Sequence, residues 1–145
     1  MLKSISESDH CCKLIRAETV ELVRENIEGE TGEHKSKFYV SVMELLDFEL
    51  TDKLKTYLFM DLNSVKKIVA QLIMALKCVH EAGFVHRDIK PDNIMFKITG
   101  KNKYLLKLID FGLAGKIKKD SKIFVKVTPC GTISFMSRAC MEGKE

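Results

Sequence analysis

Apolar residues recur along this chain at two characteristic spacings, and these spacings predict where helices and strands lie. Between about Asn63 and Gly83 the apolar residues are three or four positions apart, as on one face of a helix. The segment predicts one long amphipathic helix, which Asn63 or Ser64 caps and Gly83 ends. A charged stretch before it, residues 51–58, predicts a short helix. The apolar face of the long helix consists of Val65, Ile68, Val69, Leu72, Ile73, Leu76 and Val79.

Segments rich in β-branched and aromatic residues predict the strands. The run FYVSVM at residues 38–43 predicts one strand, and residues 13–17 predict a shorter one before a polar loop at 25–34. Residues 94–96 and 105–109 predict a hairpin with a polar connection at 99–102. From Gly112 to Thr132 no periodicity remains, which is typical of a long functional loop.

The composition is typical of one soluble globular domain. The 145 residues are 46% hydrophobic and 30% charged, and no stretch approaches the roughly 18 apolar residues of a membrane span. The net charge of +4 is too small to indicate a nucleic-acid-binding surface. Five cysteines without metal-type spacing indicate free thiols in a reducing compartment. With no secretory signal visible, we expect an intracellular protein of the cytoplasm, the nucleus left open, with neither a membrane nor a nucleic-acid partner.

Two motifs carry the candidate chemistry. The string HRDIKPDN at residues 86–93 follows the predicted long helix and precedes a predicted strand. The triplet DFG at residues 110–112 begins 17 residues after Asn93, at the end of the predicted hairpin. A lone DFG triplet occurs often by chance, but the two motifs in this order and context are a specific signal. They supply carboxylate and amide oxygens, which are suitable ligands for Mg²⁺.

The two motifs resemble the catalytic and metal-binding loops of eukaryotic serine/threonine protein kinases, and the resemblance covers most of the chain from about residue 36. It implies an α+β fold with a remnant of the small-lobe sheet and the hinge at residues 1–46. An incomplete, mainly helical large lobe with the catalytic loop and activation segment would occupy residues 47–145. It also implies the use of ATP and Mg²⁺, and transfer of the γ-phosphoryl group to a serine or threonine hydroxyl of a protein substrate.

The resemblance assigns roles to the motif residues. Asp88 corresponds to the aspartate that accepts the proton of the substrate hydroxyl or orients that hydroxyl. Lys90 corresponds to the lysine that steadies the transferring phosphate of ATP in serine/threonine kinases, and Thr132 to the threonine that bridges that aspartate and lysine. Asn93 and Asp110 correspond to the two metal ligands. Taken alone, either aspartate could instead be a capping or turn residue.

The same resemblance assigns an adenine pocket to residues around the predicted hinge. Met43 would guard the back of the pocket, and the backbones of Glu44 and Leu46 would bond to the adenine edge. Met95 would form the apolar floor, and Ile109 would line the pocket beside the metal-binding aspartate. For the two methionines the alternative is an ordinary core position.

Two details favour the casein kinase 1 group within this family. A basic, glycine-containing insertion at residues 97–104 separates the two predicted strands after the catalytic loop. The usual Ala-Pro-Glu is absent after Gly131 and Thr132, where the sequence continues as ISFMSRA. A divergent member of another kinase group could show the same two features.

Other parts of the kinase pattern are missing from the sequence. The 145 residues contain neither a glycine-rich phosphate loop nor a Val-Ala-Ile-Lys strand. We therefore expect a truncated kinase domain, whose exposed large-lobe face would be covered by a partner. Two hypotheses remain: a protein serine/threonine kinase, or a non-catalytic, kinase-like decoy that binds another protein. A small-molecule phosphotransferase with a related loop ranks below both.

Overall fold

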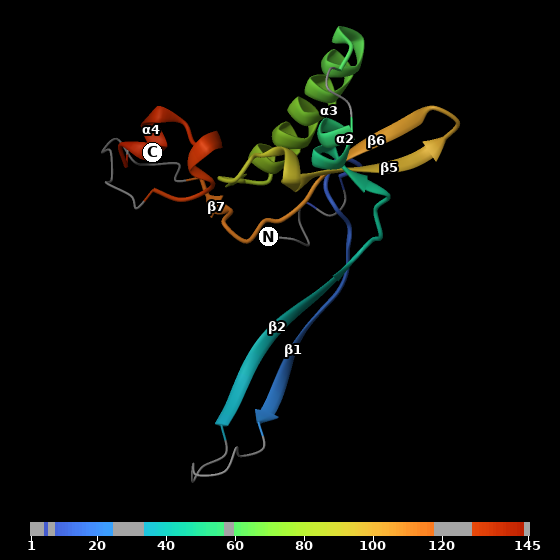
Figure 1. Ribbon diagram of the computed structural model, residues 1–145. Coiled ribbons are helices and arrows are strands. Elements are labelled where there is room, and N and C mark those ends of the chain that lie inside the picture. The colour runs from blue at the N-terminus through green and yellow to red at the C-terminus, as the bar shows by residue number, and fades with distance from the viewer. Residues whose placement is uncertain (1–4, 6–7, 25–33, 57–59, 118–128, 144–145) are drawn as a thin grey trace.

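A long antiparallel ribbon forms the N-terminal part of the structure, a computed structural model that describes residues 5, 8–24, 34–56, 60–117 and 129–143. The ribbon pairs β1 (Leu14–Arg24) with β2 (His34–Met43), in a register that runs from Leu14 opposite Met43 to Arg24 opposite His34. Figure 1 shows the ribbon projecting away from the rest of the chain. Both strands are longer than the sequence predicts, because charged residues alternate with the apolar ones and mask the pattern.

The remainder is built on a three-stranded antiparallel sheet. Its strands are β3 (Phe48–Glu49), β5 (Ile94–Gly100) and β6 (Lys103–Leu108), in the order β3-β5-β6. The predicted hairpin is present, with a tighter turn than expected, and Asn102 adopts a left-handed conformation in it (φ 57°). Helix α2 (Leu50–Thr56) follows β3, and helix α3 (Leu62–Glu81) lies beside β6 (Figure 1).

The long helix has well-defined ends. Its N-cap is Asp61, not Asn63 or Ser64 as the sequence predicts, and the Asp61 carboxylate accepts the backbone N–H of Ser64 at 3.0 Å. At the C-terminal end, Ala82 is the cap and Gly83 has a φ of 83°, the left-handed conformation that ends many helices.

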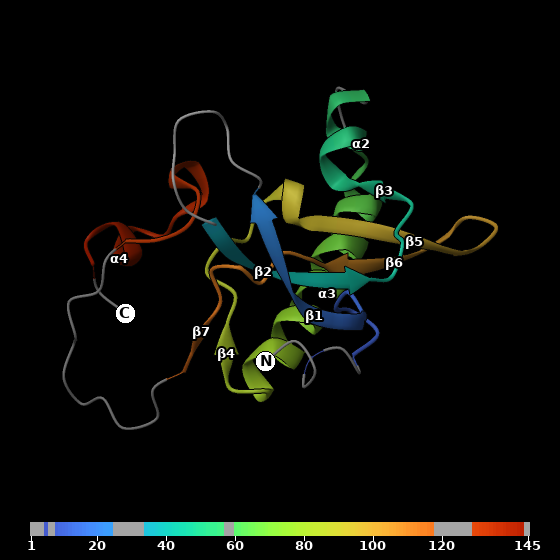
Figure 2. The same ribbon diagram turned by 90° about the horizontal axis from the view of Figure 1, so that it is seen from below.

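Two-residue strands connect the helix to the motif segments. Strand β4 (Phe84–Val85) leads from α3 into the loop at residue 86, and it pairs with β7 (Gly115–Lys116), which follows the DFG triplet. The short 3-10 helix η1 (Pro91–Asn93) leads into β5, while η2 (Ile133–Phe135) and α4 (Arg138–Met141) follow residue 132. Figure 2 shows β4 and β7 side by side, with α4 beyond them. The middle of the predicted long loop, residues 118–128, lies outside the described residues.

The core lies between α3 and the inner face of the β5–β6 hairpin. Leu106 and Leu108 of β6 and Ala75 and Val79 of α3 have no exposed surface. The predicted apolar face of α3 is split. Of its seven residues, Val79 lies in the core and Ile68, Leu72 and Leu76 pack against it, while the remaining three are exposed. The exposed three are Val65, Val69 and Ile73, at 39%, 47% and 59% of their surface.

We expect Leu106→Ala to lower the free energy of unfolding by about 2–5 kcal/mol, because the fully buried side chain would leave a cavity between α3 and the hairpin. Urea unfolding followed by circular dichroism measures the change. Leu62→Ala is the matched control, since the Leu62 side chain is 67% exposed. Equal losses in the two variants would contradict this description of the core.

Candidate active site

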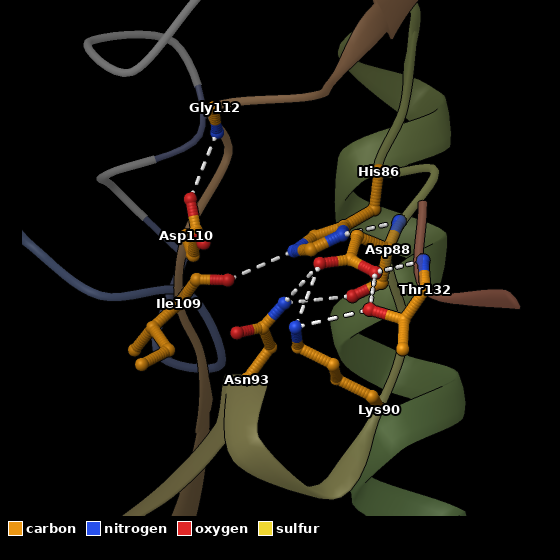
Figure 3. Close-up of polar contacts among 8 residues, drawn as sticks. All are labelled: His86, Asp88, Lys90, Asn93, Ile109, Asp110, Gly112 and Thr132. Atoms are coloured by element: carbon orange, nitrogen blue, oxygen red, sulfur yellow. Dashed lines mark hydrogen bonds and ion pairs between the residues drawn. The ribbon is translucent and has the colours of Figure 1, made fainter. Parts of the chain in front are cut away.

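The Asp88 carboxylate is the centre of a hydrogen-bonded cluster. It is 8% exposed and lies in the loop between β4 and η1. Its Oδ1 accepts the backbone N–H of Thr132 at 2.9 Å and the Thr132 hydroxyl at 2.8 Å. The side-chain amide of Asn93 donates to Asp88 Oδ2 at 3.0 Å and to the Asp88 carbonyl at 2.8 Å. Figure 3 shows these side chains pointing toward one another.

Lys90 completes the cluster. Its Nζ donates to Thr132 Oγ1 at 3.0 Å and lies 3.3 Å from Asp88 Oδ2. The Thr132 hydroxyl therefore accepts from the ammonium and donates to the carboxylate, and so bridges the two charged groups (Figure 3). Burial alone would raise the pKa of the Asp88 carboxyl, but the hydrogen bonds from Thr132 and Lys90 outweigh it and lower the pKa below its ordinary value. At neutral pH Asp88 is an ionised acceptor.

Gly131 allows the segment after the long loop to reach Asp88. Its φ is 108°, and a Cβ atom at this position would lie 2.5 Å from the Arg87 carbonyl oxygen. Only glycine lets the chain pass this close to the Arg87 backbone and still place the Thr132 N–H on the Asp88 carboxylate. The sequence pattern indicated Thr132 but gave no reason for the glycine before it.

The His86 ring connects the two motifs. It is 1% exposed and packs against the Phe111 ring, with centroids 4.8 Å apart. The ring Nδ1 accepts the backbone N–H of Asp88, so Nε2 carries the proton and donates to the Ile109 carbonyl at 2.9 Å. Burial lowers the pKa of the imidazole, despite the opposing effect of that carbonyl. His86 is therefore a neutral group that fixes the loop.

Asn93 and Asp110 belong to the two motifs that the His86 ring connects, Asn93 to the first and Asp110 to the second. Both Asn93 donor contacts go to Asp88, which leaves its side-chain oxygen available as a ligand. Asp110 has a left-handed backbone (φ 56°), and its Oδ1 accepts the Gly112 N–H at 3.1 Å. Figure 3 shows this carboxylate turned toward Gly112 and away from the Asp88 cluster. The described residues hold no cluster of three His, Cys, Asp or Glu, so a metal here would need further oxygens, as Mg²⁺ obtains from phosphates and water.

A cavity of about 420 Å³ lies next to Asp110 at the junction of the ribbon and the hairpin. It brings together all five residues for which the sequence suggested an adenine pocket: Met43, Glu44, Leu46, Met95 and Ile109. Its lining also includes Cys12 and Leu45, which the motif pattern did not indicate, and none of its lining residues belongs to the Asp88 cluster. The Cys12 thiol lies 3.8 Å from the Glu44 carbonyl oxygen.

Comparison with known proteins decides the family. Residues 8–145 match the protein kinase domain family. The chain belongs to that family. It is 36% identical over 91 residues to a casein kinase I-like protein of Caenorhabditis elegans, covering 61% of this chain and 27% of the relative. It is 34% identical over 122 residues to a protein of Encephalitozoon cuniculi named as a serine/threonine-protein kinase (83% and 22%), and 33% identical over 141 residues to sperm motility kinase 3A of Mus musculus (92% and 26%).

The family resemblance that the motifs indicated is thus confirmed, and so is the expected mixed fold of a partial kinase domain. The chain spans about a quarter of the length of these three relatives. Because the relatives carry the names of several kinase types, the casein kinase 1 assignment stays a prediction. Within the described residues, no helix has both the length and the apolar character that a membrane crossing requires.

Glu44 joins the ribbon of this kinase domain to its hairpin. Its carboxylate accepts the backbone N–H of Lys13 at 2.9 Å and pairs with Lys97 Nζ at 2.9 Å and Lys107 Nζ at 2.8 Å. The Lys107 side chain is only 7% exposed, so this ion pair is shielded from water. Sequence reasoning gave Glu44 a backbone role only and missed both lysines, which are more than 50 positions away.

Glu44 predicts an acid-sensitive contribution to stability. Burial would raise the pKa of the Glu44 carboxyl, but the bonds from Lys107, Lys97 and Lys13 lower it from 4.5 to about 2. A depressed folded-state pKa stabilises the protein fully above the unfolded value, and this stabilisation is lost as the pH falls from about 4.5 toward 2. We expect Glu44→Gln to lower the free energy of unfolding at pH 7 by on the order of 3 kcal/mol, with the difference from the native protein disappearing at low pH.

Urea unfolding at a series of pH values measures this difference. Glu81→Gln is the control, since the Glu81 side chain is 65% exposed and forms a loose ion pair with Lys77 at 3.8 Å. A difference between native protein and Glu44→Gln that stays constant from neutral pH down through the acid range would contradict the assignment.

Proposed function

We propose that the protein is an ATP-dependent protein serine/threonine kinase in which Asp88, Lys90 and Thr132 act on the reacting groups. The observation that supports this most strongly is the closed set of contacts among them. The Asp88 carboxylate is ionised, buried and held by Thr132 and Asn93, with the Lys90 ammonium beside it. Such fixed polar groups are what phosphoryl transfer requires of a protein, because most of the catalysis is positioning and charge stabilisation.

Each residue of the cluster has a separate task in this proposal. The ionised Asp88 carboxylate accepts a hydrogen bond from the substrate hydroxyl, orients its oxygen for in-line attack and receives its proton as the new bond forms. The Lys90 ammonium stabilises the negative charge on the transferring phosphoryl group. Thr132, which contacts both, holds the two charged groups at a fixed separation.

ATP and Mg²⁺ fit the remaining residues. Asn93 and Asp110 supply hard oxygen donors, and neither side chain has its full acceptor capacity used by the contacts in the described structure. Bound Mg²⁺ would supply charge neutralisation at the phosphates. In the cavity beside Asp110, the apolar side chains of Met43, Met95 and Ile109 would enclose the adenine. The backbones of Glu44 and Leu46 would bond to its edge.

The same proposal covers the organisation of the chain. Residues 1–46 would be the small-lobe part and hinge, and residues 47–145 the large-lobe part. The substrate would be a protein with an accessible serine or threonine, the protein would be intracellular, and a partner would cover the exposed apolar residues of α3. We include neither nucleic acid nor membrane among its partners.

A second candidate function is supported by one specific feature. The 145 residues include no glycine-rich phosphate loop and no Val-Ala-Ile-Lys strand. In this alternative the protein would transfer no phosphoryl group and would be a kinase-like binding protein for another kinase or for a substrate.

The two candidates are separated by incubation with labelled ATP, Mg²⁺ and casein as an acidic protein acceptor. For the kinase we expect transfer of label that falls by about 10²–10⁴-fold in Asp88→Asn, since the amide cannot accept the proton. Asp92→Asn is the matched control, because Asp92 is an exposed neighbour in η1 outside the cluster. No transfer by the native protein, combined with saturable capture of another kinase, would favour the binding protein.

Metal dependence tests the assignment of Asn93 and Asp110. We expect removal of Mg²⁺ with a chelator to weaken binding of a fluorescent ATP analogue, because the phosphates then lose the bridge to these side chains. In Asp110→Asn the affinity should depend far less on Mg²⁺, while Asp52→Asn, on an exposed position of α2, should behave as the native protein. An unchanged Mg²⁺ dependence in Asp110→Asn would remove that residue from the metal site.

A further inference from the structure

A second cavity lies apart from the candidate active site. It has a volume of about 620 Å³ and lies between α2, the first half of α3 and the sheet formed by β3, β5 and β6. None of its lining residues belongs to the Asp88 cluster or to the cavity beside Asp110. Figures 1 and 2 show α2 and the β5–β6 hairpin on one side of α3 and α4 on the other. We call this cavity the α2–α3 groove.

Aromatic rings form the floor of the α2–α3 groove. Phe48 and Phe96 stack with ring centroids 5.2 Å apart, and Tyr104 meets the Phe48 ring edge-on at 5.7 Å. The Gln71 side chain from α3 accepts the backbone N–H of Leu106 at 2.9 Å, so helix and hairpin are fixed to each other beneath the groove. The floor is thus preformed and apolar, as in sites that accept aliphatic or aromatic side chains.

The rim of the groove is positively charged. Three lysines line it from three different elements: Lys53 from α2, Lys67 from α3 and Lys103 from β6. In the part of the chain that the structure describes, none of the three ammonium groups pairs with a carboxylate. The lining contains a single carboxylate, Asp61, and this group is used as the N-cap of α3.

We propose that the α2–α3 groove is a docking site for a peptide segment of a protein partner, in which apolar side chains alternate with aspartate or glutamate. The apolar side chains would pack on the Phe48, Phe96 and Tyr104 rings. The acidic side chains would reach the lysines around the rim, where opposite charges favour encounter and correct register. The Lys53 ammonium lies over the Phe48 ring, 4.6 Å from its centroid. An acidic side chain that pairs with Lys53 would therefore bring the neighbouring apolar side chain of the peptide close to this ring.

A peptide fits these observations better than a small anion. Three cations on separate elements surround an apolar surface, whereas a site for a free anion would bring the cations together around one point with converging hydrogen-bond donors. Successive side chains of an extended peptide point to opposite sides. Such a peptide could therefore place its apolar side chains on the aromatic floor and its acidic side chains at the lysines of the rim. The site is separate from the residues of the proposed kinase reaction, so its occupancy can be measured whether or not phosphoryl transfer occurs.

Fluorescence polarisation tests the proposal with the full chain. The ligand is a short fluorescein-labelled peptide in which leucine and phenylalanine alternate with glutamate and aspartate. Two further peptides serve as controls, one with the acids replaced by their amides and one with the apolar residues replaced by serine. We expect saturable binding of the first peptide only, weakened by added salt because the rim contacts are exposed.

Charge-reversal variants locate the binding surface. We expect Lys67→Glu combined with Lys103→Glu to raise the Kd of the acidic peptide by about tenfold or more. The matched control combines Lys66→Glu with Lys101→Glu, which alters the total charge equally on the same helix and hairpin but outside the groove lining. That control should keep the Kd within about twofold of the native value. All four lysines are exposed, so we expect both double variants to fold. Circular dichroism checks this.

Three results would overturn the proposal. One is an equal loss of affinity in both double variants, which indicates binding through the net charge alone. Another is equal binding of the serine-containing control peptide, which would make the aromatic floor irrelevant. The third is displacement of the peptide by millimolar inorganic phosphate or citrate at constant ionic strength, which would identify a small-anion site instead.

Discussion

The hydrogen bonds to the Asp88 carboxylate hold together segments that are far apart in the sequence. The loop between β4 and η1 supplies the carboxylate, η1 supplies the Asn93 amide, and the segment after residue 128 supplies both donors of Thr132. A buried carboxylate is stable only when such donors surround it, so each of the three segments has one favourable position. Without this charge the segment at residues 131–132 would lose its main attachment, because η2 and α4 have few other contacts with the core.

A second ion cluster, around Glu44, performs a similar task at the junction of the ribbon and the hairpin. Glu44 is bound by groups from β5, β6 and the residue before β1, and the cavity beside Asp110 lies directly against it. The two clusters are built in the same way, because in each one acidic side chain accepts hydrogen bonds from donors in several distant segments. They differ in their partners, since Asp88 is held mainly by uncharged donors and Glu44 by two ammonium groups.

The sequence predicted those parts of the structure that depend on local pattern. The long helix and the hairpin were predicted because apolar spacing over many residues is a strong signal, and the kinase family because the two motifs are specific. The two-residue strands β4 and β7 were missed, since no pattern can be recognised over two positions. The start of α3 was placed two or three positions late because Asp61, Asn63 and Ser64 are all suitable caps.

Residues that act through distant contacts were beyond the reach of sequence reasoning. Lys97 and Lys107 look like ordinary alternating polar positions of a hairpin, and only the fold brings them to Glu44. Likewise, the lysines of the α2–α3 groove come from three elements and share no motif. The five residues for which an adenine pocket was suggested were named only because the family resemblance supplied roles for them, and their chemistry alone is not distinctive. The structure places them around one cavity, while the adenine role stays a prediction.

The outer edges of the β1–β2 ribbon constrain any further strand that pairs with it. Among the described residues neither strand has a second neighbour, so both outer edges offer backbone N–H and C=O groups to another strand. Phe38, Val40 and Val42 alternate along one face of β2, each about 40–50% exposed. An additional strand that pairs with this edge must place its apolar side chains on the same face as those of β2. A shift of its register by one residue would turn these side chains to the opposite face. The alternation of apolar residues on β2 would therefore determine the register of any strand that pairs with the ribbon.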